Sequence, residues 1–183
     1  KAAQYLKIQK HCDKEAQKIL DESFVIPFHW YQSCVLDNEQ AKITPKLEKA
    51  ISLSQQAHHE YMDLEKKKKL QQELKEETDQ VHKSFLEKVA LPAELVEAVT
   101  SECKKFSGNF TKAIFRSSTN CEDLAGFNGA GLYSSIVVNN LSDANEISKA
   151  ILQVWASLWS KRAIQERQAC NIFDVKNLSM AIL

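Results

Sequence analysis

The chain has 183 residues, of which 44% are hydrophobic and 26% are charged, as is usual for a soluble globular protein with a buried core. Lysine plus arginine number 24 and aspartate plus glutamate also number 24, so the formal net charge is zero. A dedicated nucleic-acid binder should carry a basic excess, so we expect no nucleic-acid partner. No apolar run approaches the length that crosses a bilayer, so we expect no membrane partner.

The cysteines are odd in number, widely scattered, and form no CxxC pair: Cys12, Cys34, Cys103, Cys121 and Cys170. This spacing predicts neither a zinc site nor a disulfide framework, and we expect no metal ligands in this chain. Free thiols favour a reducing compartment, so we predict the cytoplasm. The chain starts at Lys1 and stops inside an apolar run, and we therefore expect it to be part of a larger polypeptide.

The first elements in chain order are a predicted helix and a short strand. Residues 1–20 carry apolar side chains at roughly helical spacing among lysines and glutamines. Residues 24–28 are a β-prone apolar run, and its proline suits an edge strand or a strand end. For His29, which follows this run, we predict a place at the edge of the core.

Residues 44–89 are predicted to be mostly helical, with Pro45 in a first turn. One buried face is marked by Leu53, Ala57, Tyr61, Leu64, Leu74, Val81, Phe85 and Val89. The lysine run at 66–69 is flanked by glutamates, which predicts a solvated helix face rather than a phosphate or membrane contact. A short helix is then expected from Pro92 to Val99, and a turn at 107–109.

A β-prone run at 112–115 ends on Arg116, and a second strand is expected over 132–138. Three of the four glycines of the chain, Gly126, Gly129 and Gly131, lie between these runs. A guanidinium next to glycine-rich backbone amides is one way to face phosphate oxygens. The alternative is a tight connection between strands with an arginine that merely packs, and the residues alone leave both open.

The last helix is predicted from Asp143, which has capping-box spacing to Glu146. Its apolar face holds Ile147, Ile151, Val154 and Leu158, flanked by Trp155 and Trp159. One further step of four residues reaches Arg162. An arginine on an apolar face either meets an anion or pairs with a carboxylate such as Glu166, and the pattern leaves both open.

Five segments carry a family resemblance. IFRSSTNCEDLAGFNGAGLYSS resembles the RSS-x-x-x-EDL…G signature of the ATP-binding domain shared by phosphoenolpyruvate synthase, pyruvate phosphate dikinase and the glucan water dikinases. ILQVWASLWSKRAI resembles the family's tryptophan helix, and LSMAIL resembles the strand after it. FVIPFHWY is similar to an early strand of the family, and residues 1–6 resemble its opening G-x-K-x-x-N-L segment from the lysine onward.

The resemblance implies site residues and ligands. Arg116 and Arg162 would contact the phosphates of ATP and serve as catalytic residues, and Gly129 would lie in the loop that covers those phosphates. Lys1 would be the family's phosphate-binding lysine. ATP and Mg²⁺ are the implied ligands, with the metal ligands expected outside this fragment. Ala125 replaces the family's proline and Cys121 its alanine, and neither change removes a charged group.

We therefore predict an α+β fold, with an antiparallel sheet and packed helices, as the first subdomain of an ATP-grasp fold. Residues 1–183 would form a partial ATP-grasp domain, in which 44–105 are a helical insertion and 106–183 carry the motifs. The implied activity is that of an ATP-dependent dikinase-type phosphotransferase. It would pass phosphate through a phosphohistidine to a small molecule such as pyruvate, or to a glucan, and this fragment alone would be incomplete.

Two other functions stay open at this point. The chain is a non-catalytic interaction module if the charged helix of residues 46–90 is its binding surface. It is a degenerate ATP-grasp domain if it binds nucleotide without turnover.

Overall fold

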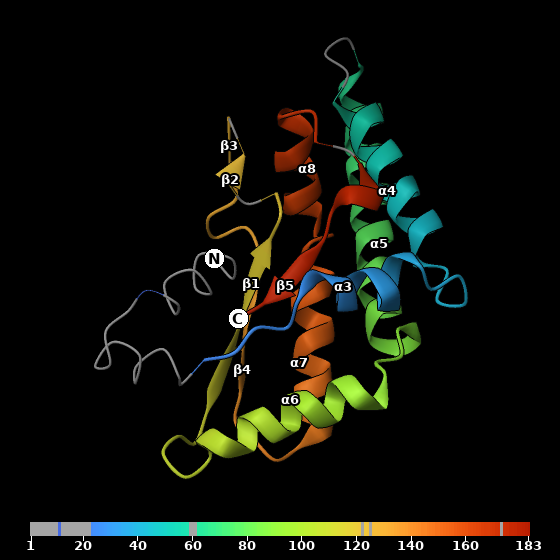
Figure 1. The fold of residues 1–183 in the computed structure, drawn as a ribbon. Coiled ribbons are helices and arrows are strands. Elements are labelled where there is room, and N and C mark those ends of the chain that lie inside the picture. The colour runs from blue at the N-terminus through green and yellow to red at the C-terminus, as the bar shows by residue number, and fades with distance from the viewer. Residues whose placement is uncertain (1–10, 12–22, 59–61, 122, 125, 173) are drawn as a thin grey trace.

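A computed structural model describes residues 11, 23–58, 62–121, 123–124, 126–172 and 174–183 (Figure 1). These residues form the predicted α+β fold, with a small antiparallel sheet and helices packed against it. The helix expected over residues 1–20 lies outside the described residues, apart from His11.

The helices precede and follow the main strand β1 (Ala113–Thr119). Before it come α3 (Phe28–Tyr31), the π-helical turn η1 (Gln32–Leu36), α4 (Ile43–Ala57), α5 (Leu64–Lys88) and α6 (Ala93–Phe106). After it come α7 (Ala144–Ser157), α8 (Lys161–Ala169) and the 3₁₀ turn η2 (Val175–Asn177).

The main sheet has the strand order β4-β1-β5, where β4 is Ser135–Val138 and β5 is Met180–Ile182. Both pairings are antiparallel, and β1 uses its first half for β4 and its second half for β5. A separate two-stranded hairpin, β2 (Asp123–Leu124) and β3 (Phe127–Asn128), lies between β1 and β4 in the sequence. The sequence patterns did not predict this hairpin.

Helices cover one face of the main sheet, as Figure 1 shows. Helix α7 packs directly against all three strands, and α6 crosses the end of the molecule where β1 begins. The α4–α5 hairpin packs on the outer side of α7 and α8. The core therefore runs from the covered sheet face through α7 into the helical hairpin.

The alternation of side chains along β1 separates this covered face from the opposite face. Phe115 is 3% exposed and belongs to the core, whereas its neighbours Ile114 and Arg116 are exposed. Successive side chains of a strand point to opposite faces, so Arg116 lies on the face of the sheet away from α7. The strand is also longer than expected, and Arg116 lies in its middle rather than at its end.

The predicted strand at 24–28 is only partly formed. Ile26 makes one antiparallel bridge to Ile182 at the edge of the sheet, and Pro27 then caps helix α3. His29, expected at the edge of the core, is exposed and lies against the ring of Trp30 at 4.9 Å. That expectation was wrong because α3 turns this side chain outward.

The predicted helical region at 44–89 forms the two packed helices α4 and α5. Ala57, Leu74, Val81, Phe85 and Val89 of the expected apolar face are buried, whereas Leu64 is 65% exposed in the first turn of α5. Lysines 66–69 are all exposed, as predicted for a solvated face. The hairpin is tied to α8 by polar contacts, in which Lys161 Nζ donates to the Gln71 carbonyl at 3.1 Å and Ser54 hydrogen-bonds Gln168.

Helix α7 begins at the predicted cap. Asp143 Oδ1 accepts hydrogen bonds from the backbone N–H groups of Asn145, at 2.8 Å, and Glu146, at 3.3 Å. The reciprocal half of the capping box is absent, because the Glu146 carboxylate accepts from the N–H groups of Asn139 and Asn140 instead, at 2.7 and 3.0 Å. The Asn139 N–H is the largest of the causes that lower the pKa of Glu146 below its ordinary value.

Replacing this cap should destabilise the domain measurably. Asp143→Ala leaves two N–H groups of the first turn without their acceptor, and we expect a loss of about 1 kcal/mol in the free energy of unfolding. Urea denaturation followed by circular dichroism measures it. Ser142→Ala, at the exposed preceding position, is the matched control and should change little. Equal midpoints for Asp143→Ala and the unmodified protein would contradict the cap.

The tryptophan helix does not continue to Arg162 as one helix. Helix α7 ends at Ser157, and Ser160 starts α8 by accepting the Ala163 N–H on its Oγ at 3.2 Å. Serine competes well for helix N-caps, so the break occurs where the sequence supplies one. None of the helices in the described part of the chain is both long and apolar enough to cross a membrane.

Candidate phosphate site

Arg116 has a rigid backbone and an exposed side chain. Its N–H donates to the Leu183 carbonyl at 2.8 Å, and its own carbonyl accepts from the Leu183 N–H at 2.9 Å. On its other side it is paired with Ser135 of β4. In the described part of the chain no carboxylate lies within 4.0 Å of Arg116. The guanidinium is therefore held on a central strand and is available to an external anion.

The glycine loop, defined here as residues 126–134, begins in the turn of the β2–β3 hairpin at Gly126, includes β3 and leads into β4. Gly126 has φ +80° and Gly131 has φ +72°, a left-handed backbone that L side chains rarely adopt. A Cβ at either position would meet nothing within 4 Å. These two positions thus need glycine for backbone conformation, and the space beside them is open to a ligand.

The middle of the glycine loop is shaped by its own hydrogen bonds. The Ala130 N–H donates to Asn128 Oδ1 at 2.9 Å, and the Leu132 N–H donates to the Gly129 carbonyl at 3.1 Å. Gly129, the glycine predicted to cover phosphates, is itself buried in this turn. Its predicted role in covering phosphates stays a prediction.

Arg162 lies in the first turn of α8 and is exposed. The residues of α8 that face the core are Ala163, Ile164, Arg167 and Gln168. Arg162 therefore does not continue the apolar face of α7, and this expectation was wrong because the helix breaks at residues 158–160. The other expectation for Arg162 was an ion pair with Glu166. Among the described residues this pair is not formed, because the charged atoms of Arg162 and Glu166 are more than 4.0 Å apart.

The glycine loop connects the strand of Arg116 with the helix of Arg162. Its last residue, Ser134, precedes the Ser135 that pairs with Arg116, and the Ser134 N–H donates to Ser157 Oγ at 3.1 Å. At its start, the Gly126 carbonyl accepts from Cys170 Sγ of the α8 C-cap at 3.4 Å. Figure 1 shows the β2–β3 hairpin beside α8.

The structure does not join the predicted site residues to one another directly. Within the described residues, no hydrogen bond or ion pair joins Arg162 to Arg116 or to Gly129. Lys1, the fourth predicted site residue, lies outside the described residues.

Arg167 is a residue that sequence reasoning missed. It is 1% exposed, and its Nη1 donates to Tyr133 Oη of the glycine loop at 3.4 Å. Its guanidinium also lies 5.2 Å from the centre of the Trp159 ring, a favourable cation–π distance. The signal was present as the four-residue spacing of Trp159, Ala163 and Arg167. This spacing was missed because the apolar face of α7 was continued from Leu158 to Arg162 instead.

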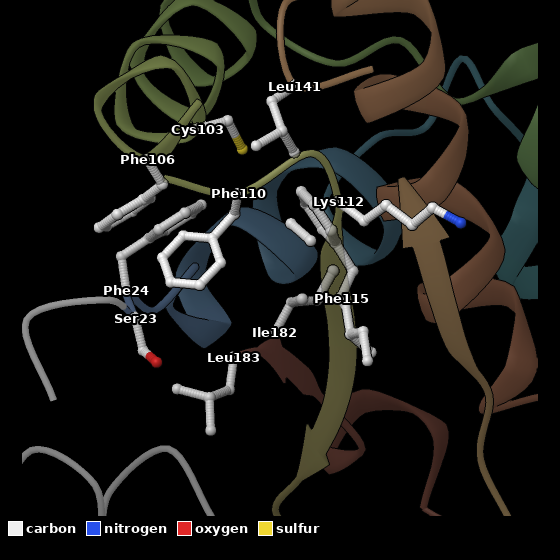
Figure 2. Close-up of a pocket in the computed structure, with 12 residues that line it drawn as sticks. Ser23, Phe24, Cys103, Phe106, Phe110, Lys112, Phe115, Leu141, Ile182 and Leu183 are labelled. Carbon is white, nitrogen blue, oxygen red and sulfur yellow. The ribbon is translucent and has the colours of Figure 1, made fainter. Parts of the chain in front are cut away.

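A cavity of about 280 Å³ lies at the other end of β1, between this strand and α6. Figure 2 shows the rings of Phe24, Phe106 and Phe110 gathered on one side of it, whereas the Lys112 amino group points away from these rings. Phe24 and Phe106 are stacked with centroids 6.4 Å apart. Because its lining is mostly apolar, this cavity does not suit phosphate.

The chemistry of the candidate site is that of anion binding. Its described groups are guanidinium, hydroxyl and backbone amide groups. Nowhere in the described part of the chain do three or more His, Cys, Asp or Glu side chains gather as metal ligands would. These residues do not fit a Mg²⁺ site, and we assign no step of the chemistry to a metal held by this chain.

Comparison with known protein families agrees with the anion-binding chemistry. Residues 14–183 match the family model described as pyruvate phosphate dikinase, AMP/ATP-binding domain. The match includes β1 with Arg116, the glycine loop, α8 and β5, which are the elements that build the candidate site. The chain therefore belongs to the AMP/ATP-binding domain family of pyruvate phosphate dikinase.

Proposed function

We propose that this chain is the ATP-binding part of a dikinase-type phosphotransferase and forms the first subdomain of an ATP-grasp fold. Residues 44–105 are its helical insertion and residues 106–183 its motif-bearing part. The single observation that carries the proposal is Arg116: an exposed guanidinium without a described carboxylate partner, on a central strand of a domain whose family binds AMP or ATP. Fixed cations of this kind bind phosphate oxygens through paired N–H donors.

In this proposal each site residue acts on the phosphates of ATP. Arg116 and Arg162 neutralise negative charge on the phosphate chain, which grows on the equatorial oxygens as a phosphoryl group departs. The glycine loop covers the phosphates with Gly129 at its centre, and Lys1 supplies a further cation. Mg²⁺ accompanies ATP and is held by carboxylates in other parts of the protein.

The proposed reaction has two transfers. An imidazole nitrogen of a histidine in another domain attacks a phosphorus of ATP, so that a P–N bond forms while the P–O bond to the leaving phosphate group breaks, and the imidazole loses its proton. An oxygen of the acceptor, either the enolate of pyruvate or a hydroxyl of a glucan, then attacks the same phosphorus while the P–N bond breaks. The imidazole takes up a proton again, and the proton that it takes up balances the one that the pyruvate methyl group or the glucan hydroxyl loses. We place the protein in the cytoplasm, in keeping with its free cysteines.

The alternative of an interaction module rests on the α4–α5 hairpin. Its apolar face is already buried against α7 and α8 through Leu74, Val81 and Phe85. What remains exposed is a charged face with intrahelical pairs, such as Lys69 with Glu73 at 3.9 Å. Such solvated pairs contribute little to affinity, so the nucleotide function is supported better.

A conservative change at Arg162 tests the proposed chemistry. In the full-length protein Arg162→Lys keeps the positive charge and loses the planar fork, and we expect kcat/KM for ATP to fall about tenfold. The accompanying readout is acid-labile phosphate on the protein after incubation with labelled ATP, as expected for phosphohistidine. Glu166→Gln is the control, because it removes the only carboxylate one turn away and should leave turnover unchanged. Equal turnover in Arg162→Lys would remove Arg162 from the site, and ATP binding without acid-labile phosphate would favour the degenerate domain.

A further inference from the structure

Arg167 is a buried cation whose described partners are all neutral. Its side chain contacts Tyr133 Oη at 3.4 Å and the Trp159 ring at 5.2 Å from the centroid. Across the described residues no carboxylate lies within 4.0 Å of it. A buried guanidinium is costly to desolvate, and an apolar side chain of similar size would fill the same space more favourably. Packing alone therefore does not explain an arginine here.

Tyr133 joins this guanidinium to the end of β1. Tyr133 Oη accepts from Arg167 and is also hydrogen-bonded to Cys121 Sγ, at 3.3 Å. Cys121 is fixed in turn by Thr119, whose Oγ1 lies 3.1 Å from the sulfur and accepts the Cys121 N–H at 3.2 Å. Burial raises the pKa of Tyr133 above its ordinary value, so the phenol stays neutral beside the guanidinium. A chain of contacts thus runs from α8 through the glycine loop to the last residue of β1.

The glycine loop is attached to the helices at three points. Tyr133 contacts Arg167, Ser134 N–H donates to Ser157 Oγ, and the Gly126 carbonyl accepts from Cys170 Sγ. The segment between these points contains Gly129 and has open space beside Gly126 and Gly131. Of the three attachments, only the one at Arg167 uses a charged side chain, and hydrogen bonds to charged groups are the stronger ones.

We propose that Arg167 is a positioning residue for the glycine loop: acting through Tyr133, it holds residues 126–134 in the conformation that receives the phosphates of ATP. With 1% of its surface exposed it does not touch ATP itself. This inference rests on the proposed function of the loop. If only a fraction of molecules holds the loop in its binding conformation, the apparent affinity for ATP falls by that fraction.

Arg167→Met tests the inference, because methionine keeps an unbranched apolar chain in the same space and removes the donor. Hydrogen exchange is read at the backbone N–H groups of Ala130, Leu132 and Ser134, which are bonded within or from the loop. We expect these amides to exchange about tenfold faster while Ile182 N–H, bonded to Ile26 in the sheet, is unchanged. In the full-length protein the KM for ATP should rise about tenfold, with kcat changed less than about twofold.

Tyr133→Phe is the second variant, and it keeps the inference testable if Arg167→Met fails to fold. It removes one hydroxyl and keeps the ring. We therefore expect the loop amides to exchange about threefold faster and the KM for ATP to rise about threefold. Unchanged exchange of the loop amides, or faster exchange of Ile182 to the same degree, would overturn the inference in favour of a purely structural arginine. Faster loop exchange with an unchanged KM would overturn the link to ATP. Failure of the proposed function itself would show separately, as unchanged ATP affinity in Arg116→Ala.

Discussion

Arg116→Ala in the full-length protein should lower kcat/KM for ATP by about a hundredfold to a thousandfold, the loss typical when a positioned donor to a charged transition state is removed. The backbone N–H and carbonyl of Arg116 are both hydrogen-bonded to Leu183, and alanine keeps both hydrogen bonds. The change therefore removes the guanidinium without removing strand β1 from the sheet. Steady-state kinetics with ATP as the varied substrate measures the effect.

Two further variants separate charge from geometry at this position. Arg116→Lys retains a positive charge on the exposed sheet face but loses the paired donors, so its kcat/KM should lie between the unmodified protein and Arg116→Ala. Lys149→Ala removes an exposed cation from α7, away from the candidate site, and should be neutral. Comparable losses in Lys149→Ala and Arg116→Ala would mean that only net charge matters, against a specific role for Arg116.

Trp155→Ala should have the largest effect on stability, with about 3–5 kcal/mol lost from the free energy of unfolding. Trp155 is 0% exposed and packs edge-on against Tyr31, with ring centroids 5.6 Å apart at 89°. It lies on the face of α7 that joins the sheet to the helical hairpin, so truncation leaves a cavity where the layers meet. Guanidinium chloride denaturation measures the loss.

Matched tryptophan variants sharpen this test. Trp30 is half-buried beside His29, and Trp30→Ala should cost distinctly less. Trp155 Nε1 is buried and has no hydrogen-bond partner among the described residues, whereas Trp159 Nε1 donates to Tyr31 Oη at 2.6 Å. Trp159→Phe should therefore cost more than Trp155→Phe, because it leaves the Tyr31 hydroxyl without its donor. Equal losses for Trp155→Ala and Trp30→Ala would contradict this account of the core.

Local patterns predicted the elements whose signals are complete within a few residues. The period of Ile147, Ile151 and Val154 identified α7, and Asp143 marked its start. The helical region at 44–89 was likewise predicted from its own residues, whereas the strand at 180–182 was predicted from the family resemblance of LSMAIL. In the helices the buried face or the cap is encoded within the element.

Features that depend on distant partners were missed. The extension of β1 beyond Arg116 requires pairing with β5, more than sixty residues later. The hairpin of β2 and β3 has only two residues in each strand, too few for a periodic signal. The sequence pattern predicted one continuous helix through Ser160, where the chain in fact ends α7 and starts α8. Continuing the apolar face of α7 by four residues therefore pointed to Arg162 instead of Arg167.

The candidate site was predicted in part for physical reasons and in part by resemblance. The glycine cluster was visible in the sequence, and the positive φ angles of Gly126 and Gly131 explain why glycine is needed at these two positions. The exposure of Arg116 requires knowing which face of β1 the helices cover. Arg167 went unnoticed because a buried arginine is identified by its contacts, here Tyr133 and Trp159, which are separated from it in the sequence.

The most direct test of the central claim is a calorimetric titration of the full-length protein and its Arg116→Ala variant with ATP, with adenosine as the ligand that lacks phosphates. Charge-assisted hydrogen bonds to phosphate are worth enough to change affinity by about tenfold or more. We predict that Arg116→Ala weakens ATP binding by at least about tenfold and leaves adenosine binding unchanged. Equal ATP affinity in the two proteins would contradict a phosphate site at Arg116.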